Sequence, residues 1–343
     1  MLILALPYLG IIPYCSGDYN PQKGGFELNI NPSKVVIIGS GFVGSSIAYA
    51  TLIQGLCTEL VLIDSNQDKA EGEVMDLSHG LPYTSPMEIR AGQYGDCRGA
   101  NVIVITAGSH QKPGQARMEL AQQNVETLRS ILNQVLQVEQ NAIFLLVTNP
   151  VDVLTTIART YPELKAHRVI GSGTVLDTAR FRYILGKRCQ LSPGNIHAYV
   201  VGEHGDSEVP LFSSVSVAGT PISLLCRECS GSCGADYQKQ VTAEVRKAAY
   251  EIINRKGSTY YGIGLSCTRI LRAILHDERS VLTVSALLDD QYKELEVALS
   301  VPSVLGKEGI LRRLPLSMDD AENEQFLKSV QTLQESVRQV KFK

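Results

Sequence analysis

The chain has 343 residues, a length that suits one large or two fused α/β domains, and 44% of them are hydrophobic, which supports a sizeable core. Its net charge of −3 gives no basic footprint for nucleic acid or an anionic membrane. No run approaches the ~20 apolar residues that span a bilayer. We therefore expect no nucleic-acid partner and no membrane partner.

The cysteines indicate the compartment. Eight of them are scattered along a long α/β sequence, which favours free thiols in a reducing, cytoplasmic location over a disulfide framework. Cys226, Cys229 and Cys233 lie close together and suit either a metal or a redox-sensitive surface loop. Because no fourth ligand is nearby and the stretch is rich in Ser and Gly, we predict no metal site.

Residues 1–31 are predicted to be an N-terminal extension that is poorly ordered. Leu2–Ile12 is apolar, but no Lys or Arg precedes it and it contains Pro7, so it is a poor secretory signal. A loose arm and a start codon placed too early are both open interpretations.

The rest of the chain is organised around Lys34–Gly44. Four apolar residues, Val35–Ile38, predict a strand buried on both faces of a parallel sheet. Gly39-Ser40-Gly41-Phe42-Val43-Gly44 follows as a G-x-G-x-x-G, and 45–56 has helical apolar spacing. In a strand–turn–helix of this kind the glycines allow a tight turn, a close approach of the backbone to a pyrophosphate, and helix–strand packing.

An acidic residue strengthens this interpretation. The next apolar run, Leu60–Ile63, ends in Asp64, twenty residues after Gly44. A carboxylate at that strand end can accept both ribose hydroxyls of NAD, and it would repel the additional phosphate of NADP. We therefore predict a dinucleotide site with NAD as the cofactor.

Further elements alternate as strand and helix. Helices are expected at 67–79 and 118–137, and strands at 88–92, 101–108, 142–147 and 167–170. This alternation predicts an α/β fold, with a doubly wound parallel sheet in a Rossmann domain at 32–172. Polar, Pro-Gly-containing residues 109–117 mark a loop at the carboxyl edge of a strand, where ligands bind in such sheets.

From residue 173 the pattern changes to a mixed α+β catalytic domain, 173–343. Helices are expected at 174–185, 236–255, 261–275 and 318–340, and strand-like runs at 196–201, 211–217, 280–287 and 295–301. The sequence shows no internal repeat.

Reduction of a keto group by a nicotinamide needs a proton donor, a cation that polarises the carbonyl, and an anchor for the substrate. His204, between glycines after a strand-like run, is the candidate donor, although a lone His of this kind is often only a surface residue. Asp177 and Arg180, three apart on a helix, can share one cleft. Asp177 would then keep His204 protonated and Arg180 would grip a carboxylate, or the two would form only a local ion pair. Arg117, on the 109–117 loop, is the candidate polarising cation.

Six motifs identify the chain as similar to one family. They are GSGFVGSS, TAGSHQKPGQAR, VTNPVDV, SGTVLDTARFR, GEHGDSEVP and KGSTYYGIG, and the resemblance covers residues 34–338. The family is that of the L-lactate/malate dehydrogenases, and the chain looks like its bacterial L-lactate dehydrogenases. Ser40, in place of the more usual Ala, and the thiol-rich loop depart from the family pattern.

The resemblance implies roles for individual residues. His204 would be the acid/base with Asp177 as its partner, Arg117 the carbonyl polariser and Arg180 the carboxylate clamp. Asn149 and Thr259 would complete the substrate site. The NAD site would be formed by Gly39, Gly41, Val43, Gly44, Asp64, Lys69, Tyr94, Gly108, Ser130, Val147, Asn149, Ser172 and Ile263.

Substrate choice in this family depends on one loop position, where malate enzymes carry Arg. Gln111 occupies it here, which suits the methyl group of pyruvate and offers no counter-charge to oxaloacetate. The expected activity is reversible hydride transfer between NADH and pyruvate, giving L-lactate and NAD. A malate dehydrogenase, or a non-catalytic NAD-binding protein of the same fold, is the alternative.

A second cationic pair suggests regulation. Arg182 follows Arg180 by about 200° round a helix, and His197 lies on the opposite face from His204 if the strand is regular. Members of the family that fructose 1,6-bisphosphate activates resemble this chain in carrying Arg and His at these positions, at a two-fold interface of a tetramer. The resemblance therefore implies a homotetramer with fructose 1,6-bisphosphate as allosteric activator.

Overall fold

The structure is a computed structural model that describes residues 19–20, 25–26, 32–109, 117–225 and 234–341. Two compact units are present, Met1–Pro32 and Ser33–Lys343. In the first, β1 (Tyr19–Asn20) pairs antiparallel with β2 (Gly25–Phe26). The remainder of the predicted extension, and the predicted thiol cluster of Cys226, Cys229 and Cys233, lie outside the described residues.

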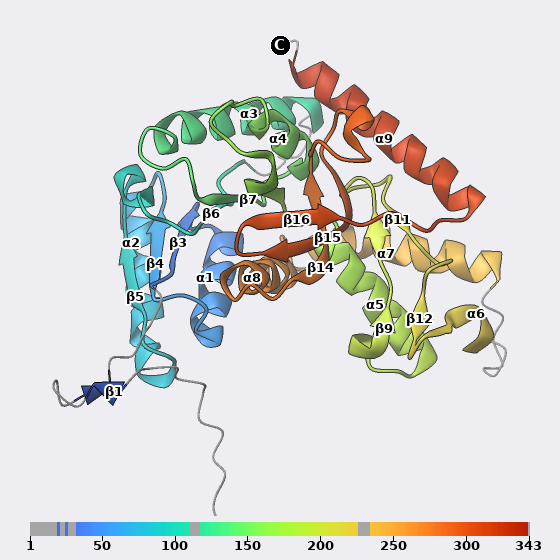
Figure 1. Ribbon diagram of the computed structural model, residues 1–343, viewed down its shortest axis with the longest axis horizontal. Coiled ribbons are helices and arrows are strands. Elements are labelled where there is room, and N and C mark those ends of the chain that lie inside the picture. Colours follow the sequence, from blue (N-terminus) through green and yellow to red (C-terminus); the bar gives the residue numbers. More distant parts are fainter. Residues whose placement is uncertain (1–18, 21–24, 27–31, 110–116, 226–233, 342–343) are drawn as a thin grey trace, which may run out of the picture. The chain divides into compact units, whose positions relative to one another are not determined.

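The second unit is built on a nine-stranded mixed sheet (Figure 1). Its strand order is β5-β4-β3-β6-β7-β8-β14-β15-β16. Six strands are parallel: β3 (Lys34–Ile38), β4 (Glu59–Ile63), β5 (Glu88–Ala91), β6 (Val102–Ile105), β7 (Ile143–Leu146) and β8 (Val169–Gly171).

This order confirms the predicted Rossmann arrangement. The chain winds outward from β3 in one direction through β4 and β5, and then in the other through β6, β7 and β8. Three antiparallel strands, β14 (Ser280–Ala286), β15 (Leu299–Gly306) and β16 (Gly309–Arg313), extend the sheet beyond β8. Residues from both predicted domains therefore contribute to one continuous sheet.

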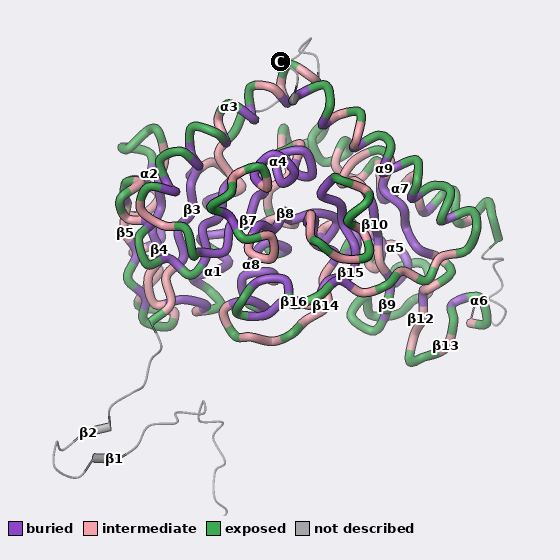
Figure 2. The backbone as a smooth tube through the Cα atoms, turned by 45° about the horizontal axis from the view of Figure 1, so that its top comes forward, coloured by how far each residue is buried: buried purple, intermediate pink, exposed green. Residues whose placement is uncertain are grey.

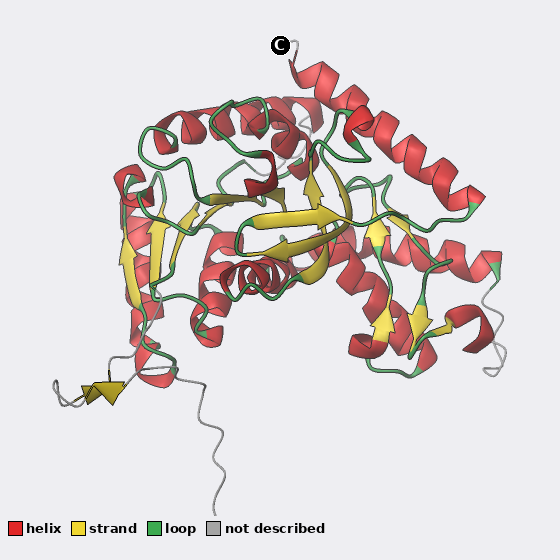
Figure 3. Ribbon diagram, viewed as in Figure 1, coloured by secondary structure: helices red, strands yellow, loops and turns green. Residues whose placement is uncertain are grey.

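Helices cover both faces of the sheet (Figure 3), and its strands are buried between them (Figure 2). Strand residues alternate between the two cores that result. Val35 and Ile37 belong to the core under α1 (Phe42–Gln54), α2 (Gln67–His79) and α8 (Tyr261–Leu275). Val36 and Ile38 belong to the core under α3 (Arg117–Val135), α4 (Val151–Ala158) and α9 (Asp320–Lys341). A strand that is apolar on both faces is explained by these two cores.

A third core joins α5 (Val175–Cys189) to α7 (Ala235–Lys256), with Phe181, Leu185 and Val241 fully buried in it. Five short strands follow α5 in the chain and form two small sheets. They are β9 (Ile196–His197), β10 (Val200–Val201), β11 (Val209–Pro210), β12 (Ser216–Val217) and β13 (Thr220–Pro221), followed by α6 (Ile222–Leu225).

Single turns of 3₁₀ helix complete the described elements, at Leu81–Tyr83, Tyr94–Cys97, Ala166–Arg168, Pro193–Asn195 and Lys293–Leu295. In the part of the chain that the structure describes, no helix combines the length and apolar character needed to cross a bilayer.

The predicted strand 196–201 is wrong as one continuous element, because it breaks at Ala198 and Tyr199. Backbone groups on both sides of the break bond to side chains of the α5 segment. Arg182 Nε donates to the Ala198 carbonyl at 3.0 Å, and the Val200 amide donates to Thr178 Oγ1 at 3.0 Å. The regular alternation assumed between His197 and His204 therefore does not hold.

Other elements also differ from prediction, and β16 and α6 were not predicted. The run 211–217 is strand only at its end, since β12 begins at Ser216, and the predicted strand 295–301 is shifted to Leu299–Gly306. The helix α4 was not predicted, because its eight residues are fewer than the run of about 10 to 12 that marks a helix by its period.

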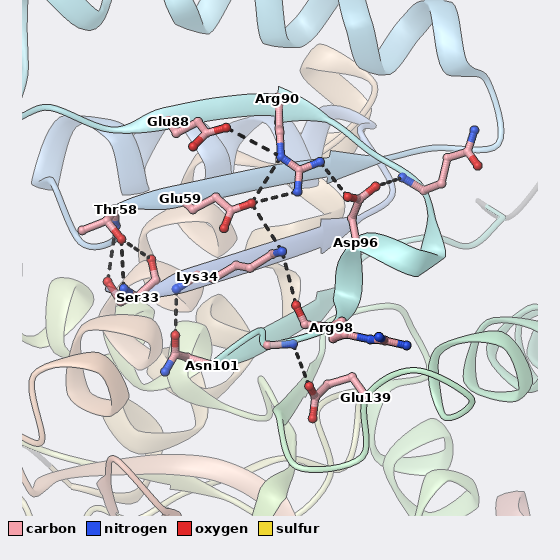
Figure 4. Close-up of polar contacts among 12 residues, drawn as sticks. Ser33, Lys34, Thr58, Glu59, Glu88, Arg90, Asp96, Arg98, Asn101 and Glu139 are labelled. Carbon is pink, nitrogen blue, oxygen red and sulfur yellow. Dashed lines mark hydrogen bonds and ion pairs between the residues drawn. The ribbon is translucent and has the colours of Figure 1, made fainter. Parts of the chain in front are cut away.

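Polar side chains tie the amino ends of the parallel strands together (Figure 4). Arg90 of β5 donates to Glu59 Oε1 of β4 at 2.8 Å and to Asp96 Oδ1 at 2.8 Å, and Lys34 of β3 lies 3.3 Å from the same Glu59 oxygen. These contacts link β3, β4 and β5 to one another through a single carboxylate, Glu59.

Candidate active site

The turn after β3 has the geometry that a dinucleotide pyrophosphate requires. Gly39 has φ +107°, and a Cβ there would lie 2.6 Å from the Ala107 nitrogen. A Cβ on Gly44 would lie 1.9 Å from the Gly39 oxygen, so α1 packs as closely as only glycine allows. A Cβ on Gly41, by contrast, would meet only the Lys69 ammonium, at 3.9 Å. Open space at the middle glycine is what a bound phosphate needs.

Asp64 follows β4 at the same edge and is held by Ser40. Its Oδ2 accepts from the Ser40 amide at 2.7 Å and from the Ser40 hydroxyl at 3.0 Å, while Oδ1 accepts from the Asn66 amide at 3.0 Å. Burial alone would raise the pKa of Asp64, but these donors outweigh it and the pKa lies below its ordinary value. The carboxylate is therefore ionised and ready to accept ribose hydroxyls.

Other predicted cofactor residues follow the carboxyl ends of successive parallel strands. Tyr94 comes after β5, Gly108 after β6, Val147 after β7 and Ser172 after β8. Because parallel strands end at one edge, these residues share that edge with the glycine turn. The remaining ones lie on helices: Val43 on α1, Lys69 on α2, Ser130 on α3 and Ile263 on α8.

His204 lies in the connection from β10 to β11, and Asp177 lies in the first turn of α5. His204 Nδ1 is 2.6 Å from Asp177 Oδ2, and Arg180 Nη1 donates to Asp177 Oδ1 at 2.6 Å. The Asp177 side chain is only 2% exposed, whereas those of Arg180 and His204 are 14% and 22% exposed. One buried carboxylate thus holds both the candidate acid and the candidate anchor.

This contact changes the acid strength of both partners. Burial alone would lower the pKa of His204, but the Asp177 carboxylate, with smaller contributions from Asp152 and Glu208, raises it to about 9. Burial would raise the pKa of Asp177, yet His204 and Arg180 outweigh it and the pKa is lowered. His204 is therefore an imidazolium at neutral pH, which is the form that donates a proton.

Two further carboxyl groups beside His204 were not predicted from the sequence. Asp152 of α4 accepts from the His204 amide at 2.7 Å, and burial raises its pKa to about 6. Glu208 is 2% exposed, and burial and the Asp177 charge raise its pKa to about 8. The signal for Asp152 was a lone charge within an apolar run; Glu208 had no signal in its immediate neighbours.

Asp177, His204 and Glu208 each present one atom within 4.8 Å of the others, a spacing that a metal ion would accept. Both Asp177 oxygens are already in use, however. Nδ1 of His204 contacts Asp177, and the other Asp177 oxygen is paired with the Arg180 cation. The geometry favours a network of ion pairs over a metal centre.

Asn124 of α3 is a third residue that the sequence reasoning missed. It is buried, and its side chain bonds to the Ser109 amide at 2.8 Å and to the Asn149 carbonyl at 2.8 Å. It thereby links the segments that leave β6 and β7. Asn149, predicted to contact substrate and cofactor, is exposed at this point.

Part of the predicted substrate site lies outside the described residues. Gln111 lies outside the described residues, and Arg117 is described only as the first residue of α3. Thr259 is half-buried in the segment between α7 and α8. The predicted regulatory residues are described: His197 is exposed on β9, and Arg182 stacks on Tyr199, 5.3 Å from its ring centroid.

The arrangement supports a defined chemistry. A dinucleotide-binding turn with an ionised acid for the ribose is present, together with a protonated His and an Arg beside it. These are the parts needed to transfer hydride to a carbonyl while a proton is delivered to its oxygen.

Comparisons with known proteins give the same picture. Residues 33–171 match the family model of the lactate/malate dehydrogenase NAD-binding domain, and residues 174–343 match that of the lactate/malate dehydrogenase α/β C-terminal domain. The chain is 46% identical over 308 residues to an L-lactate dehydrogenase of Thermoanaerobacter sp. (strain X514), covering 90% of this chain and 99% of the relative. It is 46% identical over 302 residues to an L-lactate dehydrogenase of Geobacillus thermodenitrificans, covering 88% of this chain and 95% of the relative.

Among solved structures, the minor L-lactate dehydrogenase of Enterococcus mundtii superimposes with a TM-score of 0.86 at 42% identity, covering 90% of this chain and 98% of the other. A lactate dehydrogenase from a Medee basin deep-sea metagenome library also superimposes with a TM-score of 0.86, at 41% identity, covering 90% of this chain and 99% of the other. The chain therefore belongs to the lactate/malate dehydrogenase family.

Proposed function

We infer that this chain is an NAD-dependent L-lactate dehydrogenase that interconverts pyruvate plus NADH and L-lactate plus NAD. The inference rests on relatives of that activity at about 45% identity over most of their length. The observation that carries the mechanism is the contact between His204 and Asp177 at 2.6 Å.

In the proposed mechanism, NAD supplies or accepts the hydride, and the protein supplies the rest. His204 would donate its proton to the carbonyl oxygen during reduction and take it back during oxidation. Asp177 would hold the imidazole in orientation and stabilise its charged form. Arg180 uses one guanidinium nitrogen on Asp177, and the other N–H donors of a guanidinium suit a substrate carboxylate.

The cofactor fits the residues that are present. Gly39 and Gly44 allow the tight turn, Gly41 leaves room there for a pyrophosphate, and the Asp64 carboxylate would accept from the adenosine ribose. The remaining residues of the predicted NAD set are proposed to line the same edge. Arg117 is proposed to polarise the carbonyl, and Asn149 and Thr259 to contact the substrate.

Pyruvate is preferred over oxaloacetate in this proposal because Gln111 offers no positive charge to a second carboxylate. Malate dehydrogenase activity is the alternative within the family. A non-catalytic NAD-binding protein is the other alternative, and it would have no need of a histidine held protonated by a buried carboxylate.

A homotetramer is proposed, and an apolar surface supports assembly. Exposed Phe42, Tyr49 and Ile53 of α1 lie with Tyr261 and Leu265 of α8 around a hollow of about 530 Å³. Apolar groups gathered on one face commonly mark a contact between subunits, and identical subunits satisfy it by two-fold symmetry.

Activation by fructose 1,6-bisphosphate is proposed through Arg182 and His197. The exposure of His197 supports this, while Arg182 already bonds to the Ala198 carbonyl and would have to share its guanidinium with a phosphate. The test is pyruvate saturation with and without activator, on the parent, R182Q and H197A. The activator is expected to lower the apparent KM for pyruvate in the parent but not in the two variants. Identical curves for the parent with and without activator would contradict activation.

A cytoplasmic location is also proposed. Cys57, Cys97 and Cys267 are buried free thiols, which suits a reducing compartment.

The proposed activity is tested by following NADH absorbance with pyruvate and with oxaloacetate in parallel. Oxidation of NADH that is faster with pyruvate is expected. Preference for oxaloacetate would indicate the malate enzyme, and no oxidation with either would contradict a dehydrogenase.

A further inference from the structure

Glu208 is a buried carboxyl group that the proposed mechanism does not use. It directly precedes β11 and is 2% exposed. Its Oε1 is shielded from solvent and accepts no hydrogen bond from any residue that the structure describes. A carboxylate in such surroundings is costly, so the neutral acid is favoured at neutral pH.

The fold brings this group to the catalytic pair. Antiparallel pairing of β10 with β11 turns the chain back after His204, so that Glu208 and His204 lie at the same end of the hairpin. The α5 helix supplies Asp177. One carboxyl oxygen of Glu208, one of Asp177 and a ring nitrogen of His204 all lie within 4.8 Å of one another.

Charged groups reach Glu208 from two helices. From α5 come the Asp177 carboxylate and the Arg180 cation, and from α7 comes Arg246, whose Nη2 donates to the main-chain oxygen of Glu208 at 2.5 Å. Burial and Asp177 outweigh the positive charges of His204, Arg180 and Arg246 and raise the pKa of Glu208 to about 8. His204 also faces Asp152 of α4, which accepts from its amide.

We propose that Glu208 is a positioning residue for the acid of the dehydrogenase reaction: in alkaline solution its carboxyl group ionises, and the new negative charge keeps the proton on His204. The proposal rests on the proposed function. At neutral pH Glu208 is uncharged, and Asp177, with a smaller contribution from Asp152, stabilises the imidazolium.

The physical reason is that the two groups titrate together. When the pH rises past the Glu208 pKa, which burial and the Asp177 charge raise to about 8, this carboxyl group loses its proton beside an imidazolium that Asp177 holds in its charged form. A full negative charge then stands beside the imidazolium and makes its proton harder to remove. The enzyme would thus retain a protonated acid to a higher pH than the Asp177 contact alone allows.

The test is the pH dependence of kcat/KM for pyruvate, from about pH 6 to about pH 10, on the parent and on E208Q. The amide has the size of the neutral acid and cannot ionise. We expect activity at about pH 6.5 within about twofold of the parent, and an alkaline limb that moves to lower pH by roughly one unit. An alkaline limb at the parental pH would overturn the proposal.

Two variants separate charge from packing. E208D keeps an ionisable group, so its alkaline limb should lie nearer to that of the parent than the limb of E208Q does. E251Q removes an exposed carboxylate of α7, whose side chain is 63% exposed, and should leave the profile unchanged. If E208D and E208Q show the same shift, packing and not charge is responsible, and the proposal fails.

A spectroscopic measurement does not depend on turnover. The infrared difference spectrum of the parent between about pH 7 and about pH 9.5 should show loss of a protonated-carboxyl band, because this range spans the Glu208 pKa of about 8. The spectrum of E208Q should lack this band. Absence of this band overturns the proposal even if pyruvate is reduced. Its presence in a parent that does not reduce pyruvate would instead overturn the proposed function.

Discussion

Asp177 Oδ2 lies 2.6 Å from His204 Nδ1, and the second oxygen of the same carboxylate pairs with Arg180. Asp177 lies in the first turn of α5, a helix of the third core. His204 follows β10, and Gly202 between them bridges to Ser300 of the nine-stranded sheet. The distance between acid and substrate anchor is therefore set by a single buried group.

The first prediction concerns this carboxylate. Asp177→Asn removes the charge that raises the pKa of His204, so the imidazole should lose its proton at lower pH. Because reduction needs the protonated form, the alkaline limb of kcat/KM for pyruvate should move down, and kcat should fall by about two orders of magnitude. A pH–rate profile on parent and variant measures both. An unmoved limb would count against the Asp177–His204 contact as the source of the acid strength.

The second prediction concerns Ser40, whose hydroxyl donates to Asp64 at 3.0 Å. Ser40→Ala removes one of the donors that orient the carboxylate, and we expect NADH to bind about three- to tenfold more weakly. The value of kcat at saturating NADH should change little. NADH fluorescence titration measures the affinity. T332A, which removes a hydroxyl bonded within α9, is the control. Equal affinities in S40A and parent would show that the Ser40 amide alone orients Asp64.

The third prediction concerns substrate choice. Gln111→Arg should shift preference from pyruvate toward oxaloacetate by several kcal/mol, the scale of pairing a desolvated charge. The ratio of kcat/KM for the two substrates is the measurement. A ratio that stays at the parental value would mean that Gln111 is not the discriminating residue.

The fourth prediction concerns stability. In the folded chain the pKa of His204 is raised from 6.5 to about 9 and that of Glu208 from 4.5 to about 8. Between its ordinary and its raised pKa, each group binds more protons in the folded chain than in the unfolded chain. The free energy of unfolding should then fall as pH rises from about 6.5 to about 9. E208Q should make the fall shallower. Urea unfolding at fixed protein concentration tests this, and a free energy that rises over that range would contradict the assignment.

Much of the fold could be predicted because it is encoded locally. Val35–Ile38 is apolar on both faces, the glycines follow at once, and Asp64 ends the next apolar run, so each signal lies within a short stretch. The helix α4 was not predicted because it has only eight residues, fewer than the run of about 10 to 12 that marks a helix by its period.

The site was predictable where spacing along one element sufficed. Asp177 and Arg180 share a helix face, and their contact follows from the i to i+3 relationship. Asp152 and Glu208 reach His204 only through packing of α4 and the return of β11, which no local pattern encodes. The break at Ala198 arises in the same way, from a hydrogen bond donated by Arg182 of a different element.

The most direct test of the account compares His204→Gln with the parent for pyruvate reduction and for NADH binding. Glutamine keeps a polar side chain but cannot deliver a proton, so kcat should fall by about 10²- to 10⁴-fold while the Kd for NADH stays within about threefold. A variant that reduces pyruvate at the parental rate would contradict the assignment of His204 as the acid.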